Sequence, residues 1–168
     1  MKNILLVFPV PDDEQMGAIS PPLSILYLGA FLEKTGLPVA YIDLRIQSMD
    51  DFNGELDKEP LLVGVSSMSG YQLVGAIEVL KATRKKNPDL PTVLGGIHAS
   101  LLPEQSLSSA LVDFVVIGEG EYTLLELVHE LTKSGPELGK ILGLGWKKNK
   151  STKVINPSRP FMDLSKSA

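Results

Sequence analysis

Apolar stretches alternate with amphipathic stretches along most of the chain. Short apolar runs predict strands buried on both faces of a sheet, at residues 4–8, 39–44, 61–67, 92–96 and 113–118. Longer segments between them have the apolar spacing of helices, at 22–36, 69–87 and 121–134. The acidic segment 48–60 predicts a crossover helix that is short or irregular.

Regular alternation of strand and helix predicts an α/β fold: a doubly wound, Rossmann-like or flavodoxin-like sheet of five mostly parallel strands with flanking helices. The pattern changes after Gly135, where residues 141–160 predict two strands joined by a polar turn. We therefore expect an α/β domain over 1–136, an appended β-hairpin over 137–160, and a linker or truncated end over 161–168. The Leu, Tyr and Phe side chains within 26–32 are expected in the core.

Composition narrows the class of protein. The 168 residues suit one domain, and 43% hydrophobic and 21% charged residues are typical of a globular protein. A net charge of −4 with scattered basic residues argues against nucleic acid as a partner. No apolar run approaches the roughly 20 residues of a membrane span. The absence of cysteine favours the cytoplasm and excludes disulfides, thiolate zinc sites and iron–sulfur clusters within this chain.

Ligands of doubly wound folds bind at the carboxyl ends of the strands. The segments that follow the predicted strands there are 9–23, 66–70, 95–100 and 118–122. Three of these four are rich in Gly and Ser, so the backbone can approach a ligand closely. This edge of the sheet is the expected site.

The Gly118-x-Gly120 pair resembles half of a dinucleotide-binding fingerprint, but Thr123 occupies the place of the third glycine. Glu119 and Glu121 would also repel a pyrophosphate. No Walker loop is present. A dinucleotide or nucleoside triphosphate is therefore disfavoured at this turn.

Other α/β sites lack their chemistry as well. Asp12 and Asp13 follow the first strand as in a phosphoacceptor domain, but no aspartate closes the third strand and no lysine closes the fifth. The prolines after the first strand offer no donors for a flavin phosphate. Of the two histidines, His129 is expected at the edge of a helix face, whereas His98 lies in a Gly-rich loop where it could contact a ligand. Without a partnered acid or nucleophile, His98 is a weak catalytic candidate.

Four motifs together resemble one family. The stretches ISPPLSILYLGAFLEKTG, VGVSSMSG, TVLGGIHAS and VDFVVIGEGEYTLLELV, followed by INPSRPFMDL, are similar in order and spacing to the N-terminal cobalamin-binding domain of cobalamin-dependent radical SAM enzymes. The resemblance covers nearly the whole chain. It implies that the corrin lies over the carboxyl edge of the sheet and that the dimethylbenzimidazole tail enters a slot beside it.

The resemblance also implies which residues contact cobalamin. Glycines would clear space for the flat tail, Ser66 would hydrogen-bond its base, and the 118–121 turn would border it. No residue of this chain is expected to be catalytic or to bind a metal ion directly. The implied cofactor-binding residues are Pro21, Pro22, Leu23, Ser66, Ser67, Met68, Gly95, Gly96, His98, Gly118, Glu119, Gly120 and Glu121.

One departure separates this chain from cobalamin-binding mutases, which carry Asp-x-His-x-x-Gly after the first strand. No histidine occurs in that segment here, which implies base-off cobalamin without a protein imidazole on cobalt. The lack of cysteine implies that S-adenosylmethionine and a 4Fe–4S cluster belong to a C-terminal radical SAM domain of a longer parent, expected to be a methyltransferase. The chain is then a fragment or a stand-alone binding domain.

Two other interpretations stay open at this point. The chain could be a non-catalytic α/β regulatory or interaction module, because glycine at strand ends is ordinary turn chemistry. It could also be the N-terminal half of a nucleotide-sugar transferase, which has Gly-rich loops on a similar sheet.

Overall fold

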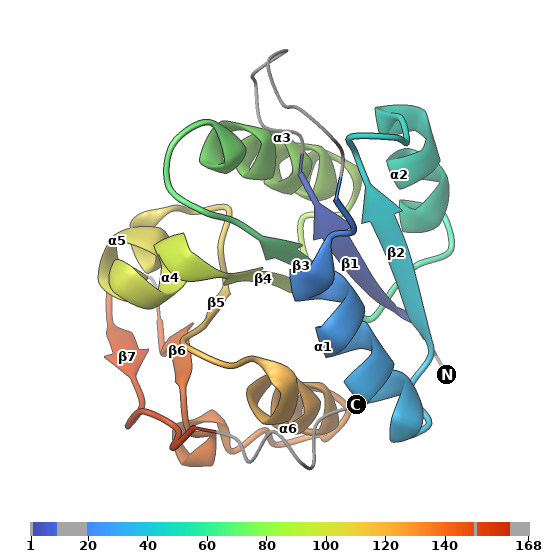
Figure 1. The fold of residues 1–168 in the computed structure, drawn as a ribbon. Coiled ribbons are helices and arrows are strands. Elements are labelled where there is room, and N and C mark those ends of the chain that lie inside the picture. The colour runs from blue at the N-terminus through green and yellow to red at the C-terminus, as the bar shows by residue number, and fades with distance from the viewer. Residues whose placement is uncertain (1, 10–19, 150, 162–168) are drawn as a thin grey trace.

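The computed structural model describes residues 2–9, 20–149 and 151–161. Its seven strands form one mixed sheet in the order β2-β1-β3-β4-β5-β6-β7 (Figure 1). The first five strands are parallel, and the last two continue the sheet as an antiparallel hairpin beside β5. The doubly wound α/β prediction is confirmed, with the hairpin extending the sheet. The strands are β1 (Ile4–Phe8), β2 (Val39–Asp43), β3 (Leu62–Ser66), β4 (Thr92–Gly95), β5 (Phe114–Val116), β6 (Leu144–Lys147) and β7 (Lys153–Ile155).

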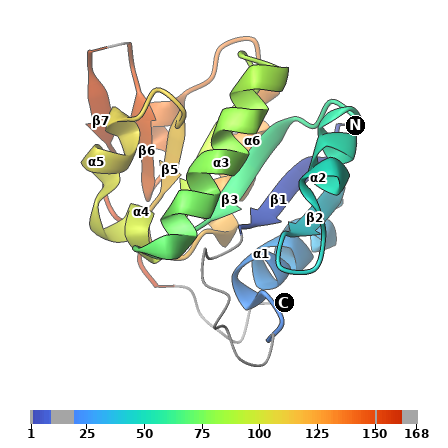
Figure 2. The same ribbon diagram turned by 90° about the horizontal axis from the view of Figure 1, so that it is seen from above.

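Helices cover both faces of this sheet. Helices α1 and α6 lie on one face, whereas α2, α3, α4 and α5 lie on the other, as the two views show (Figures 1 and 2). None of the helices in the described part of the chain is long and apolar enough to cross a membrane. The helices are α1 (Leu23–Lys34), α2 (Met49–Leu56), α3 (Tyr71–Lys86), α4 (Ile97–Leu101), α5 (Pro103–Ser108) and α6 (Glu121–Leu131), with a 3-10 turn at Leu138–Lys140.

The apolar strands supply two cores because successive side chains point to opposite faces. Leu5, Val7 and Val63 pack under α2 and α3, whereas Ile4 and Leu6 pack under α1 and α6. All of these side chains are buried. Continuous apolar runs are what a sheet covered on both faces requires.

The sequence predicted the long helices but not every short one. The acidic segment does form a short helix, α2, whose first turn is closed by a capping box between Ser48 and Asp51. Helices α4 and α5 were not predicted, because five or six residues give too little periodicity. The expectation that the residues at 26–32 are core is wrong for Leu26 and Tyr27, which are exposed, and correct for Phe31.

A buried ion pair fixes the segment that enters α1. The Arg45 side chain donates hydrogen bonds to both carboxylate oxygens of Asp43, at 2.9 and 2.7 Å, and to the carbonyl oxygen of Ser20 at 2.8 Å. Its guanidinium also stacks over the ring of Phe8, with the centre of charge 4.4 Å from the ring centroid. Burial raises the pKa of Asp43, but the hydrogen bonds from Arg45 outweigh it and hold the pKa below 3.8.

We predict that Asp43→Ala lowers the free energy of unfolding by about 3 kcal/mol at pH 7, because it leaves the Arg45 charge buried without its partner. Since the folded-state pKa of Asp43 is depressed, its contribution is complete above the unfolded-state pKa and disappears as the pH falls through the folded-state value. Urea unfolding from pH 7 to pH 2 should therefore show the gap between wild type and variant closing below about pH 4. Glu78→Gln, in an exposed ion pair with Lys81, should change stability little. A gap of the same size at every pH would contradict the assignment.

Candidate functional site

A cavity of about 210 Å³ lies between α1 and α6, over the carboxyl halves of β1, β3, β4 and β5. It adjoins the point where the connections diverge, because β1 leads into α1 on one face and its neighbour β3 leads into α3 on the other. The lining residues are Leu6, Ser24, Ile25, Leu28, Gly64, Val65, Ser66, Val93, Gly95, Gly96, Val116, Gly118, Glu119, Gly120, Glu121 and Leu124.

Two glycines of the sheet make room for this cavity. Leu6, Gly64 and Val93 stand side by side in one row across β1, β3 and β4, so the middle strand contributes no side chain there. In the row nearer the carboxyl ends, Gly95 stands beside Ser66. A Cβ built on Gly95 would meet no atom closer than 4.0 Å, at Val116, so it would occupy free space. The sheet therefore has a hollow on the face covered by α1 and α6.

Hydrogen bonds between the loops hold the carboxyl edge together. The backbone N–H of Ser67 donates to the carbonyl oxygen of Gly95 at 3.0 Å, and the N–H of His98 donates to the carbonyl oxygen of Ser67 at 3.2 Å. The hydroxyl of Ser100 accepts from the N–H of Gly118 at 2.9 Å and donates to the carbonyl oxygen of Gly96. The loops after β3, β4 and β5 are thus one connected unit.

Gly96 is required by the close approach of two of these loops. Its φ of +92° lies in the left-handed region, and a Cβ there would lie 2.5 Å from the carbonyl oxygen of Ser67. Only glycine fits both conditions, so Gly96 sets the path of the chain from β4 into α4.

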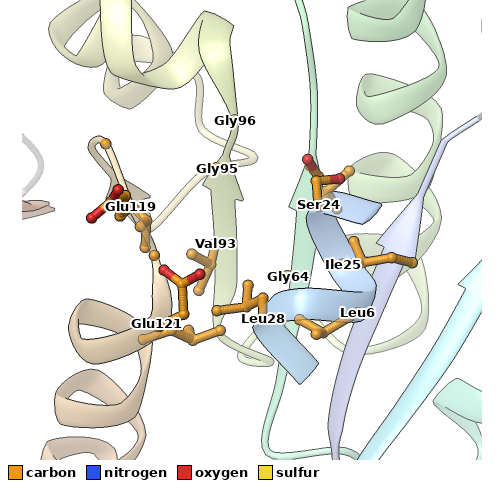
Figure 3. A pocket seen from close by; sticks show the side chains of 16 residues that line it. Leu6, Ser24, Ile25, Leu28, Gly64, Val93, Gly95, Gly96, Glu119 and Glu121 are labelled. Atoms are coloured by element: carbon orange, nitrogen blue, oxygen red, sulfur yellow. The ribbon is translucent and has the colours of Figure 1, made fainter. Parts of the chain in front are cut away.

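Glu121, the first residue of α6, brings an unsatisfied polar atom to the wall of the cavity. Its Oε2 atom is buried and has no hydrogen-bond partner in the described part of the chain. Figure 3 shows its carboxylate near Leu28 and Val93, while Glu119 lies nearer the carboxyl edge. An unpaired buried acceptor costs about 1–3 kcal/mol, and a donor on a bound ligand would relieve this cost.

His98 is buried in α4 and does not line the cavity. Its Nδ1 atom lies 3.0 Å from the hydroxyl oxygen of Ser69, within hydrogen-bonding distance. This contact and its backbone bond to Ser67 give His98 a structural role in the loop unit. His129, which the sequence placed at the edge of a helix face, is exposed on α6.

The structure brings part of the predicted set to the cavity. Those that line it are Ser66, Gly95, Gly96, Gly118, Glu119, Gly120 and Glu121. The remaining predicted residues stand at the same edge without lining the cavity, and they are Pro21, Pro22, Leu23, Ser67, Met68 and His98. Asp12 and Asp13 lie outside the described residues.

Sequence reasoning missed the apolar wall of the cavity, which comes from Ile25 and Leu28 of α1 and Leu124 of α6. Their helical spacing was visible, but it does not separate a residue that lines a cavity from one that fills a core. The floor of the cavity was easier to predict from the sequence. Side chains alternate between the two faces of a strand, and this alternation places Leu6 on one defined face of β1.

The lining favours binding over bond-making chemistry. It is mostly apolar and glycine, with no histidine or lysine. The described residues hold no group of three or more His, Cys, Asp or Glu side chains suited to a metal ion. A cavity of about 210 Å³ is below the roughly 300–1,000 Å³ that encloses a drug-sized ligand, so it fits one flat part of a larger molecule.

Comparison with known proteins gives a family match. The model of the B12 binding domain family matches residues 14–128. The chain is 34% identical over 168 residues to an uncharacterised methyltransferase of Pyrococcus horikoshii, covering 95% of this chain and 36% of that protein. It is 29% identical over 161 residues to the cytidylyl-2-hydroxyethylphosphonate methyltransferase of Streptomyces wedmorensis, covering 84% and 30%. The chain thus spans about a third of the length of these relatives.

Solved structures share the fold. The radical S-adenosylmethionine methyltransferase TsrM of Kitasatospora setae, with cobalamin and a 4Fe–4S cluster bound, superposes with a TM-score of 0.75 at 24% identity, covering 99% of this chain and 31% of that chain. The cobalamin-dependent S-adenosylmethionine radical enzyme OxsB, with aqua-cobalamin bound, gives 0.80 at 24% identity, covering 96% and 23%. At this identity the likeness establishes the architecture.

The two adjacent glycines provide a matched test of the site geometry. We predict that Gly96→Ala lowers the free energy of unfolding by at least about 1–3 kcal/mol, because alanine is strained at this φ and its Cβ collides with Ser67. Gly95→Ala should stay within about 0.5 kcal/mol of wild type, because its methyl group enters the cavity. Urea denaturation of both variants measures the difference. Equal destabilisation would show that the described cavity is absent in solution.

Proposed function

This chain belongs to the B12-binding domain family, and from that premise we propose that its cavity receives the nucleotide tail of cobalamin while the corrin lies over the carboxyl edge of the sheet. The observation that carries the proposal is the cavity itself. It lies on the sheet beside the topological switch point, which is where doubly wound folds bind ligands. Cobalamin is the cofactor, and the chain is a cofactor-binding domain.

The lining suits the flat base at the end of the tail. Apolar side chains of α1 and α6 line the cavity together with Gly64 and Gly95, and Gly95 leaves free space where a side chain would stand. The Oε2 atom of Glu121, which has no partner among the described residues, can accept a hydrogen bond from a donor on the tail. Ser66, at the end of β3, offers a hydroxyl on the same wall.

We extend the proposal to the state of the cobalt. No imidazole lines the cavity, and the ring of His98 contacts Ser69 instead. The segment between β1 and α1 contains no histidine at all. These facts support base-off cobalamin that receives no nitrogen ligand from this chain.

We also propose that the parent is a radical SAM methyltransferase. The support is that two relatives, which extend well beyond the aligned region, are named methyltransferases, and that the solved structure of TsrM, which shares the fold, is a radical S-adenosylmethionine methyltransferase. S-adenosylmethionine and a 4Fe–4S cluster would then belong to a C-terminal radical SAM domain, because this chain has no cysteine. A cytoplasmic location, the lack of a nucleic-acid partner and the domain boundaries at 136 and 160 remain predictions. Family membership disfavours the regulatory-module and nucleotide-sugar transferase interpretations.

We predict that the purified chain, mixed with hydroxocobalamin and desalted, retains the cofactor and its visible absorbance. Gly95→Ala should weaken binding about tenfold, because its methyl group takes space that the tail needs. Gly54→Ala is the matched control, since Gly54 is exposed on α2 and a Cβ added there would have no atom within 4 Å, and it should bind as wild type does. A folded wild-type chain that emerges colourless would refute cofactor binding by this domain.

A second prediction concerns the cobalt ligand. Bound cobalamin should show the absorption spectrum of the base-off form, because its tail is held in the cavity away from the metal. His98→Gln should leave that spectrum unchanged, since the His98 ring is bonded to Ser69. Visible spectroscopy of both bound proteins at matched saturation makes the comparison. A spectral change on replacement would identify His98 as a cobalt ligand.

A further inference from the structure

The Glu121 carboxylate lies on the wall of the cavity, inward of its carboxyl edge. Figure 3 shows it level with Leu28 and Val93, whereas Glu119, Gly95 and Gly96 lie toward the carboxyl edge. Val93 belongs to the row of the sheet that includes Gly64, one step inward from the row of Gly95. A tail that enters from the carboxyl edge therefore passes Gly95 first and brings its terminal group to Glu121.

The chemistry of this position is specific. A carboxylate accepts hydrogen bonds and donates none, and the Oε2 atom of Glu121 has no donor among the residues that the structure describes. The surrounding side chains of Leu28, Val93 and Leu124 supply no donor either. A donor on the ligand would therefore satisfy an oxygen that no described residue satisfies.

The terminal base of cobalamin does not provide that donor. Dimethylbenzimidazole, once linked to its ribose, has no N–H, and its free ring nitrogen is itself an acceptor that the carboxylate would repel. Adenine, in the same position of a related cobamide, carries an exocyclic amine with two N–H bonds. Such an amine would form a charge-assisted hydrogen bond to the carboxylate.

We infer that Glu121 is a specificity-determining residue that reads an N–H of the terminal base, so that the site prefers cobamides with an amine-bearing base over cobalamin. The inference rests on the proposed function, because it requires the tail to occupy the cavity. Beyond the proposed function, it names an amine-bearing base as the preferred class of tail and Oε2 of Glu121 as the atom that selects it. A ribose hydroxyl is less suited to Glu121, because the ribose precedes the base and lies nearer the rim.

The test compares equilibrium dissociation constants of the purified chain for cobalamin, for the adenine-containing cobamide and for cobinamide, which lacks the nucleotide. All three are used with the same upper ligand. We expect the adenine form to bind about tenfold tighter than cobalamin, and cobinamide to bind weakest. Glu121→Met should remove the preference, because methionine keeps the length of the side chain and loses the acceptor. Glu78→Met, exposed on α3 and away from the cavity, should retain it.

Each outcome separates the inference from the function on which it rests. Equal affinity of wild type for both complete cobamides would overturn the role of Glu121 and leave cobalamin binding intact. A preference that survives Glu121→Met would also overturn it. Cobinamide binding as tight as the others would show that the tail is not held in the cavity, and binding of none would refute both proposals. If Glu121→Met fails to fold, the wild-type ratio alone still decides.

Discussion

A sheet that is covered by helices on both faces has no room for a ligand unless side chains are missing from it. In this protein the constraint is met by Gly64 and Gly95, which stand in successive rows of β3 and β4 under the helix pair α1 and α6. The rows remain apolar elsewhere, with Leu6 and Val93 flanking Gly64, so the sheet keeps its core while a hollow opens at the carboxyl end. The position of the cavity thus follows from two residues that lack a side chain.

The hollow would be of little use without fixed walls. The backbone bonds that join Ser67, Gly95 and His98, together with the bond between Gly118 and Ser100, tie three loops into one edge. The bond to Ser100 uses its side-chain hydroxyl, whereas the others join backbones, and Gly96 allows the close approach of its own loop to Ser67. The walls are therefore largely formed before any ligand arrives, which lowers the entropy that binding must cost.

The sequence was most informative where one physical constraint dominated. Apolar runs and helix spacing located the strands and the long helices, and the loops after the strands pointed to the edge where the cavity lies. It was less informative about Leu26 and Tyr27, because an apolar residue in a helix is core only if another element covers it. The cavity wall at Ile25 and Leu28 had the same ambiguity. The unpaired oxygen of Glu121 could not be foreseen at all, since satisfaction of a polar atom depends on neighbours that only folding brings together.

The small volume of the cavity bears on the rest of the cofactor. About 210 Å³ accommodates the tail, so under the proposed function the corrin must lie outside, on the carboxyl edge. The residues that follow the strands there include exposed apolar side chains, namely Leu23 at the start of α1, Met68 after β3 and Ile97 at the start of α4. A corrin resting on them would remove apolar surface from water, so these residues contribute affinity without polar contact. Selectivity would then come from the tail and affinity from the macrocycle, which divides the two tasks between different parts of one edge.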